Sequence, residues 1–178
     1  MRNPFLNRTF STAIFYIGWV ICLQEVSKEH SYYGFLLVFC FLIYFLYYSA
    51  CRKADALLLF LILLIGPFSD MIYAHFGLLK YHSMHQLHSL IPPLWVFILW
   101  ALFGANVHLF SWLKHRWWLS TLLGAVGGPA SYFSVIKLGG ASLLKPLPFT
   151  MVTIGGVWAI FFPFLIWLNE YLNKKFRT

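Results

Sequence analysis

Long apolar stretches alternate with short polar ones along the whole chain. Six of these stretches come close to the roughly 20 residues that a helix needs to cross the hydrocarbon core of a bilayer. They predict six transmembrane helices, over residues 9–25, 32–50, 54–75, 91–113, 117–136 and 149–168. Because the connections between them are short, we expect an all-α polytopic membrane bundle that forms one integral membrane domain over residues 1–178.

Composition agrees with this fold class. Hydrophobic residues make up 61% of the chain and charged residues 10%, and the mean hydropathy is +0.74. These values are typical of a polytopic membrane protein and exclude a soluble globular domain. Arg2 and Arg8 precede the first apolar stretch as in a secretory signal, but no small-residue cleavage pattern follows it, so we interpret it as a helix.

Basic residues are distributed unevenly between the two predicted membrane faces. In a six-helix topology, the face with the termini holds nine of them, Arg2, Arg8, Arg52, Lys53, Lys114, Arg116, Lys174, Lys175 and Arg177. The opposite face holds Lys28, Lys80, Lys137 and Lys145. The positive-inside rule therefore places both termini in the cytoplasm. The formal charge of +8 then reflects topology and attraction to anionic lipid, and no nucleic-acid partner is expected.

One acidic residue, Asp70, lies inside the third predicted helix, in the string LILLIGPFSDMIYAHFG. It lies about 15 residues from the cytoplasmic end of that helix, roughly 22 Å at the rise of an α-helix, and so in the outer third of the membrane. The same count reaches Gln24 in the first helix and Ser131 and Tyr132 in the fifth. An ionisable side chain at this depth is costly, which makes it a functional candidate.

The face that carries Asp70 also holds Gly66, Tyr73 and Gly77, whereas the bulky apolar residues lie elsewhere on the helix. Small residues allow close helix contact, so we expect Asp70 to point into the bundle. The candidate catalytic residues are Asp70, Tyr132 and His75, and the candidate substrate-binding residues are Gln24, Tyr73, Ser131 and Trp95. The structural alternative is that Asp70 pairs with His75, Lys80 or Lys137 and only orients the helices.

Three histidines, His82, His85 and His88, are spaced three apart in a predicted outer loop. They are weak candidates for a metal site, because imidazole binds several transition metals. The iron-dependent membrane desaturases gather their ligands from several such boxes, and this chain has seven histidines in all. A solvated loop therefore explains them better. The chain has no phosphate-binding loop, nucleophile elbow, zinc helix or CxxC pair, so we expect no metal and no cofactor.

Small residues are concentrated in the fifth predicted helix, in the string LLGAVGGPASYF. Gly124 and Gly128 form a small-xxx-small pair, and Gly155 and Gly156 follow in the sixth helix. Such residues allow the backbones of neighbouring helices to approach closely. We therefore expect these two helices to pack tightly.

The strings WWLSTLLGAVGGPASYFSVIKLG and PPLWVFILWALFGANVH, together with Asp70, resemble a bacterial inner-membrane family of unknown function over nearly the whole chain. The resemblance implies the bacterial inner membrane as location. Genes of that family often lie beside genes for cyclopropane-type fatty-acid modification and for flavin-dependent amine-oxidase-like proteins, which implies membrane-lipid metabolism as the setting.

A weaker likeness connects Asp70, Gly77, Tyr81, Pro93 and Trp95 to membrane carotenoid hydratases and lycopene cyclases, which usually have Glu at the position of Asp70. It implies a mechanism in which a carboxylic acid, kept neutral by desolvation, protonates an alkene in a lipid chain.

Three classes of function follow from these observations. The first is an enzyme or enzyme component that acts on a membrane lipid or isoprenoid through Asp70. The second is a non-catalytic lipid-binding or assembly subunit, whose partner is another protein of a membrane complex. The third is a small transporter, which the absence of an inverted repeat between residues 1–89 and 90–178 disfavours.

Overall fold

The computed structural model describes residues 8–25, 32–82 and 91–176, with the side chains of residues 8–11, 23–25 and 32–33 left out. It contains six α-helices within these ranges, one over each predicted stretch. They are α1 (Arg8–Glu25), α2 (Tyr32–Tyr48), α3 (Arg52–His75), α4 (Leu94–Asn106), α5 (Trp117–Lys137) and α6 (Leu147–Phe176). The predicted all-α bundle is therefore confirmed.

Two details differ from the prediction. The predicted fourth helix changes to a tighter 3-10 helix, η1 (Val107–Leu113), before it ends, and α6 runs well beyond residue 168. Four segments are long and apolar enough to cross a membrane: Arg52–His75, Leu94–Leu113, Trp117–Lys137 and Leu147–Phe176. Thr12–Cys22 and Gly34–Tyr48 are shorter apolar segments in the described part of the chain.

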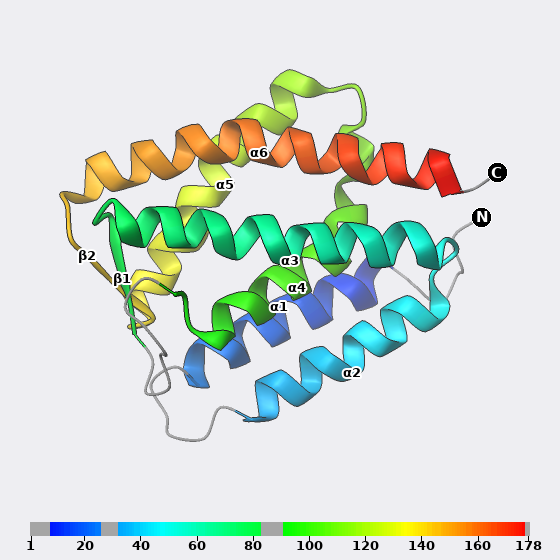
Figure 1. Ribbon diagram of the computed structural model, residues 1–178, viewed down its shortest axis with the longest axis horizontal. Helices are drawn as coiled ribbons and strands as arrows, with labels where there is room; N and C mark the ends of the chain where they lie inside the picture. Colours follow the sequence, from blue (N-terminus) through cyan, green and yellow to red (C-terminus); the bar gives the residue numbers. More distant parts are fainter. Residues whose placement is uncertain (1–7, 26–31, 83–90, 177–178) are drawn as a thin grey trace.

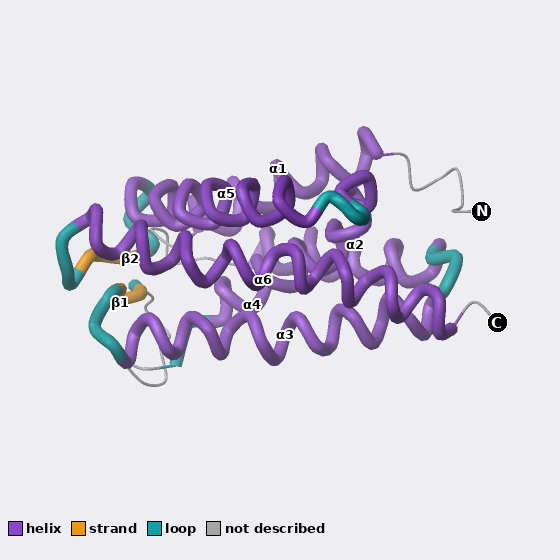
Figure 2. The backbone as a smooth tube through the Cα atoms, turned by 90° about the horizontal axis from the view of Figure 1, so that it is seen from above, coloured by secondary structure: helices purple, strands orange, loops and turns teal. Residues whose placement is uncertain are grey.

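The helices lie roughly along one long axis (Figure 1). The start of α1 and the end of α6 lie at the same end of the molecule, and α3 and α5 both run toward the opposite end. Seen from above, α1 and α5 lie along one side of the bundle and α3 along the other (Figure 2). This arrangement leaves α4 and α6 in contact with several neighbours, and fully buried Leu102, Ile154 and Leu165 come from these two helices.

Two short strands, which the sequence pattern did not predict, close the end of the bundle away from the termini. They are β1 (Leu79–Tyr81), which follows α3, and β2 (Ala141–Leu143), which follows α5. The strands pair in antiparallel fashion, with Lys80 opposite Ser142. Because side chains alternate along a strand, Lys80 is exposed while Leu79 and Tyr81 are buried.

Glycines allow close packing of α5 on α6, as the sequence predicts. A Cβ atom at Gly124 would lie 2.3 Å from the backbone oxygen of Trp158, and one at Gly155 would lie 2.9 Å from that of Ala125. Side chains larger than hydrogen therefore do not fit at these crossings. Gly156, by contrast, has nothing within 4 Å of such a Cβ atom.

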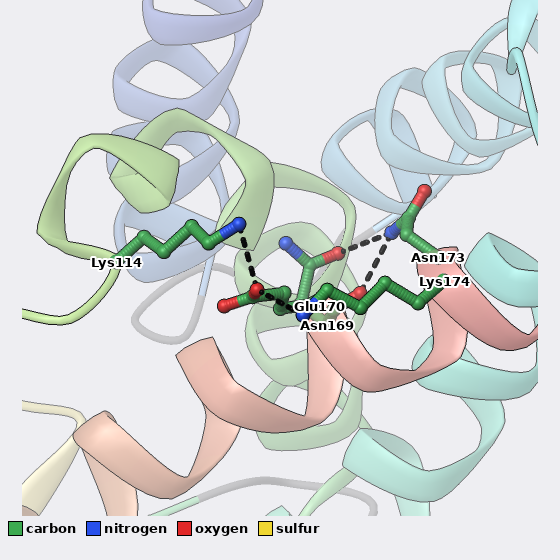
Figure 3. A network of polar contacts seen from close by, with 5 residues as sticks. All are labelled: Lys114, Asn169, Glu170, Asn173 and Lys174. Atoms are coloured by element: carbon green, nitrogen blue, oxygen red, sulfur yellow. Dashed lines mark hydrogen bonds and ion pairs between the residues drawn. The ribbon is translucent and has the colours of Figure 1, made fainter.

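Polar contacts join η1 to α6 near the other end of the bundle (Figure 3). The Lys114 Nζ atom lies 2.7 Å and the Lys174 Nζ atom 3.0 Å from Oε1 of Glu170. On the same helix, the Asn173 side-chain amide donates to the backbone oxygen of Asn169 at 2.8 Å. The lysine side chains are 45% and 71% exposed, so solvent screens these pairs and they add little stability.

Candidate functional site

Asp70 is the centre of the candidate site. Its side chain is buried, with only 1% of the residue exposed, and it accepts hydrogen bonds from three neutral donors. The Tyr81 hydroxyl and the Tyr132 hydroxyl, the latter at 2.7 Å, both donate to Oδ1. The Trp100 indole Nε1–H donates to Oδ2 at 2.6 Å. A carboxylate has about four acceptor positions, so one position on Oδ2 remains for another donor.

Each donor comes from a different element. Gly77, with a φ of 63°, turns the chain out of α3 and into β1, and the alternation of β1 directs Tyr81 back toward Asp70. Trp100 comes from α4 and fits against α3 because position 66 is glycine, where a Cβ atom would lie 2.2 Å from the Trp100 ring. Tyr132 comes from α5. The carboxyl group therefore joins three helices and a strand.

The structural alternative requires an ion pair between Asp70 and His75, Lys80 or Lys137. No such pair is formed, so this alternative is wrong. Among the described residues, Lys114 and Lys174 form their salt bridges with Glu170, and Asp70 forms none. Lys80 is exposed on the outer face of β1, and His75 is exposed at the end of α3. The Lys137 Nζ atom lies 5.4 Å from the centre of the Phe133 ring. Hydrogen bonds to neutral groups take the place of a counter-charge.

An apolar cavity of about 90 Å³ adjoins the carboxyl group. A cavity needs only about 10–15 Å³ of such space to hold one water molecule, so this volume accommodates the end of a chain or a small head group. Phe15 and Trp19 of α1 line it on one side, and Ser131, Tyr132 and Val135 of α5 line it on another. The remaining lining residues are Asp70, Tyr81, Trp95, Val96, Leu99, Trp100, Phe103 and Trp158.

Several of the predicted site residues meet at this cavity. Ser131, Tyr132 and Trp95 line it together with Asp70. Tyr73 is buried behind Tyr132, with the two rings edge to face and their centres 5.6 Å apart. The side chain of Gln24 lies outside the described residues.

Other predicted residues are not brought to the cavity. His75 is exposed and packs on Phe76, and it does not line the cavity with Asp70 and Tyr132. His82 Nε2 lies 2.5 Å from the Ser142 hydroxyl, and its backbone oxygen accepts a hydrogen bond from Trp95. His85 and His88 lie outside the described residues. Among the residues that are described, no three His, Cys, Asp or Glu side chains form a group that could hold a metal ion.

Comparison with known proteins identifies a family. A family model described as a protein of unknown function, DUF2878, matches residues 9–164. The chain belongs to the DUF2878 family. No curated protein and no solved structure matches the chain. The family assignment agrees with the resemblance to an uncharacterised family, whereas these comparisons give no support to a likeness to carotenoid enzymes.

The sequence did not predict two of the hydrogen-bond partners of Asp70 in this DUF2878 protein. Tyr81 was connected to Asp70 only by the likeness to carotenoid enzymes, and no sequence pattern indicated Trp100. A signal for Trp100 was present in Gly66, one helical turn before Asp70, because a glycine on a functional face marks the close approach of a large neighbour. Which large side chain fills that space depends on how α4 packs.

Proposed function

We propose that this DUF2878 protein binds an apolar membrane-borne molecule, a lipid or an isoprenoid, at the Asp70 cavity and acts in membrane-lipid metabolism as an enzyme or enzyme component. The proposal includes six membrane spans, cytoplasmic termini and location in the bacterial inner membrane. One observation carries it: a fully buried carboxyl group, held by three neutral donors, forms part of the wall of an aromatic cavity.

The cost of this carboxyl group supports a functional role. Burying an ionisable side chain at membrane depth is unfavourable by several kcal/mol on insertion scales, and no cation offsets it among the described residues. An apolar side chain of similar volume would join the same helices without that cost. A role toward a molecule bound in the cavity therefore explains an acid at this position better than a purely structural role does.

Acid-base chemistry is the reaction class that the site supports. The Tyr81 and Tyr132 hydroxyls can each donate to an ionised carboxylate or accept from a protonated one, so Asp70 can be hydrogen-bonded in both protonation states. A carboxyl group of this kind can give a proton to an alkene or take one from a carbon acid in the cavity. The lining is mostly apolar and aromatic, and electrostatic interactions are stronger in such surroundings than in water.

A second candidate is a non-catalytic subunit that binds lipid or helps to assemble a membrane complex. The observation that favours it is that three elements, β1, α4 and α5, are joined to α3 by hydrogen bonds to Asp70. In that case Asp70 contributes stability alone.

The experiment is comparative lipidomics of a deletion strain complemented with the wild-type protein, with Asp70→Asn or with Asp55→Asn. Asp55 is a matched control, because it is a buried acid at the opposite end of the same helix that accepts a hydrogen bond from Ser49 at 2.6 Å. All three proteins must reach the membrane in equal amounts. We expect a lipid species that the wild type and Asp55→Asn restore and Asp70→Asn does not.

Two other outcomes contradict the enzyme proposal. If Asp70→Asn restores the lipid profile as well as the wild type does, Asp70 is structural and the second candidate stands. If deletion changes no lipid species at all, the enzyme proposal is wrong.

A further inference from the structure

Two segments of the chain carry the same order of residues. The string GPFSDMIYAHFG covers residues 66–77, and GPASYFSVIKLG covers residues 128–139, with Gly, Pro, Ser and the final Gly at matching positions. Each segment is followed by a helix that contains a similar string, WALF at 100–103 and WAIF at 158–161. The sequence therefore contains two copies of one motif.

The first feature that shows the copies to be equivalent in space is the helix crossing. A Cβ atom at Gly66 would lie 2.2 Å from the Trp100 ring, and one at Gly128 would lie 2.3 Å from the Trp158 ring. The two tryptophan rings stack on each other, with their centres 5.4 Å apart and their planes at 11°. Each copy thus packs a glycine of its first helix against a tryptophan of its second.

The helix ends are the second equivalent feature. Gly77 and Gly139 both have positive φ, 63° and 82°, and each is followed by a strand. The strands pair so that Lys80 and Ser142, which hold matching positions in the two copies, lie opposite each other. An antiparallel pair centred on matching residues has local two-fold symmetry.

The copies differ in how their polar groups are used. Asp70 of the first copy matches Tyr132 of the second, and these two meet in a hydrogen bond of 2.7 Å. Ser69 donates to the Gly66 backbone oxygen at 2.6 Å, and Trp100 donates to Asp70. Ser69, Asp70 and Trp100 of the first copy therefore all have hydrogen-bond partners within the protein.

Ser131 and Trp158 hold the matching positions in the second copy, and both line the cavity. No hydrogen bond joins the Ser131 hydroxyl or the Trp158 indole nitrogen to another described residue. The second copy thus places two residues with unused hydrogen-bond donors in the wall of the cavity. The carboxyl group of the first copy lines the same cavity.

We infer that Ser131 and Trp158 bind the ligand, donating hydrogen bonds to a neutral acceptor oxygen, such as an ester carbonyl, at the end of an apolar chain. The inference rests on the proposed function, since it assigns residues and a ligand class to the same cavity. The lining explains why the oxygen is neutral. Among the described residues, no Lys, Arg or His lines the cavity to balance an anionic head group, and an ionised Asp70 would repel one.

The test uses photo-crosslinking of the purified full-length protein with the methyl ester of a diazirine-bearing stearic acid, followed by mass spectrometric mapping of the labelled peptides. In the wild type we expect saturable labelling of peptides from α1, α4 and α5. Ser131→Ala and Trp158→Phe each remove one donor and should weaken apparent binding roughly two- to tenfold, the range for loss of one hydrogen bond.

Two controls separate binding from structure. Ser69→Ala makes the matched change in the first copy, where the hydroxyl is bonded to the helix backbone, and should leave labelling unchanged. A diazirine-bearing octadecane, which has no carbonyl, should label the wild type, Ser131→Ala and Trp158→Phe equally. Ser131 is exposed, so Ser131→Ala should fold normally even if Trp158→Phe does not.

The outcomes distinguish the inference from the proposed function. If the ester labels Ser131→Ala as strongly as it labels the wild type, the role of Ser131 is overturned. The Asp70 site then remains in place. Equal weakening with the ester and the hydrocarbon shows a structural effect and also overturns the inference. No saturable labelling of the wild-type cavity by either probe overturns the proposed function, and the inference with it.

Discussion

At the scale of single residues, the site depends on which hydroxyl groups find partners. Tyr132 and Tyr73 lie side by side in the core, with their rings edge to face. The Tyr132 hydroxyl donates to Asp70 at 2.7 Å, whereas the buried Tyr73 hydroxyl has no hydrogen-bond partner among the described residues. A made hydrogen bond stabilises the fold modestly, and an unmade one in a buried position costs free energy. The two tyrosines should therefore respond in opposite ways to loss of the hydroxyl.

We predict that Tyr132→Phe lowers the free energy of unfolding by about 0.5–1.5 kcal/mol and that Tyr73→Phe leaves it unchanged or raises it. Both substitutions remove one hydroxyl and keep the ring, so each is the control for the other. The measurement is denaturant-induced unfolding of the purified protein in detergent, followed by circular dichroism. Equal destabilisation by the two substitutions would show that the Tyr73 hydroxyl has a partner, such as a bound water or ligand.

At the scale of elements, the same turn ends α3 and α5. In α3, the Gly77 N–H donates to the Ala74 oxygen and the Leu78 N–H to the Tyr73 oxygen; in α5, the Gly139 and Gly140 N–H groups bond in the same pattern. This is the Schellman motif, which needs a left-handed residue after the helix. Since each turn leads directly into β1 or β2, the two glycines set the position of the strand pair and, through β1, that of Tyr81.

We predict that Gly77→Ala and Gly139→Ala each lower the free energy of unfolding by about 1–2 kcal/mol, the cost of left-handed backbone for a residue with a Cβ atom. Steric overlap does not contribute, because nothing lies within 4 Å of a Cβ atom at either position. The control is Gly127→Ala, at an equally open position inside α5, which should be neutral or stabilising. Thermal unfolding in detergent measures all three, and a loss of stability in Gly127→Ala alone would contradict the account.

At the scale of the whole molecule, charge is distributed along the long axis. Exposed basic residues Arg52, Lys53, Lys114, Arg116, Lys174 and Lys175 lie in or next to the elements at the end that holds the start of α1 and the end of α6 (Figure 1). Lys80 and Lys145 lie beside the strands, toward the other end. By the positive-inside rule, the first end should face the cytoplasm and the strand pair should face the periplasm.

We predict that a membrane-impermeant maleimide labels Lys80→Cys in intact spheroplasts and labels Lys174→Cys only after lysis. Both positions are exposed, so reactivity reports the side of the membrane. The control is the parent chain, in which Cys22 and Cys51 are buried and Cys40 is exposed in the middle of apolar α2. Labelling of both variants in intact spheroplasts would place the two ends on the same side and contradict the six-span topology.

The sequence by itself determined the six helices and which residues share a layer with the acid. Helices form over all six apolar stretches, because continuous apolar runs of membrane-spanning length favour helix regardless of neighbours. Counting along those helices placed Asp70, Ser131 and Tyr132 in one layer, and the observed hydrogen bond from Tyr132 to Asp70 and the position of Ser131 at the cavity agree with it. Rise per residue is a local property, so it can be read from one helix at a time.

Only the tertiary structure decided which side chains surround the acid. Helices such as α4 are apolar on every face, so their sequence does not indicate which face turns inward. The selection of Trp100 as a donor, the exposure of His75 and the pairing of β1 with β2 all depend on how helices rotate and cross. Those rotations are set by close packing at Gly66 and Gly128 against two stacked tryptophans, an arrangement that involves four helices at once.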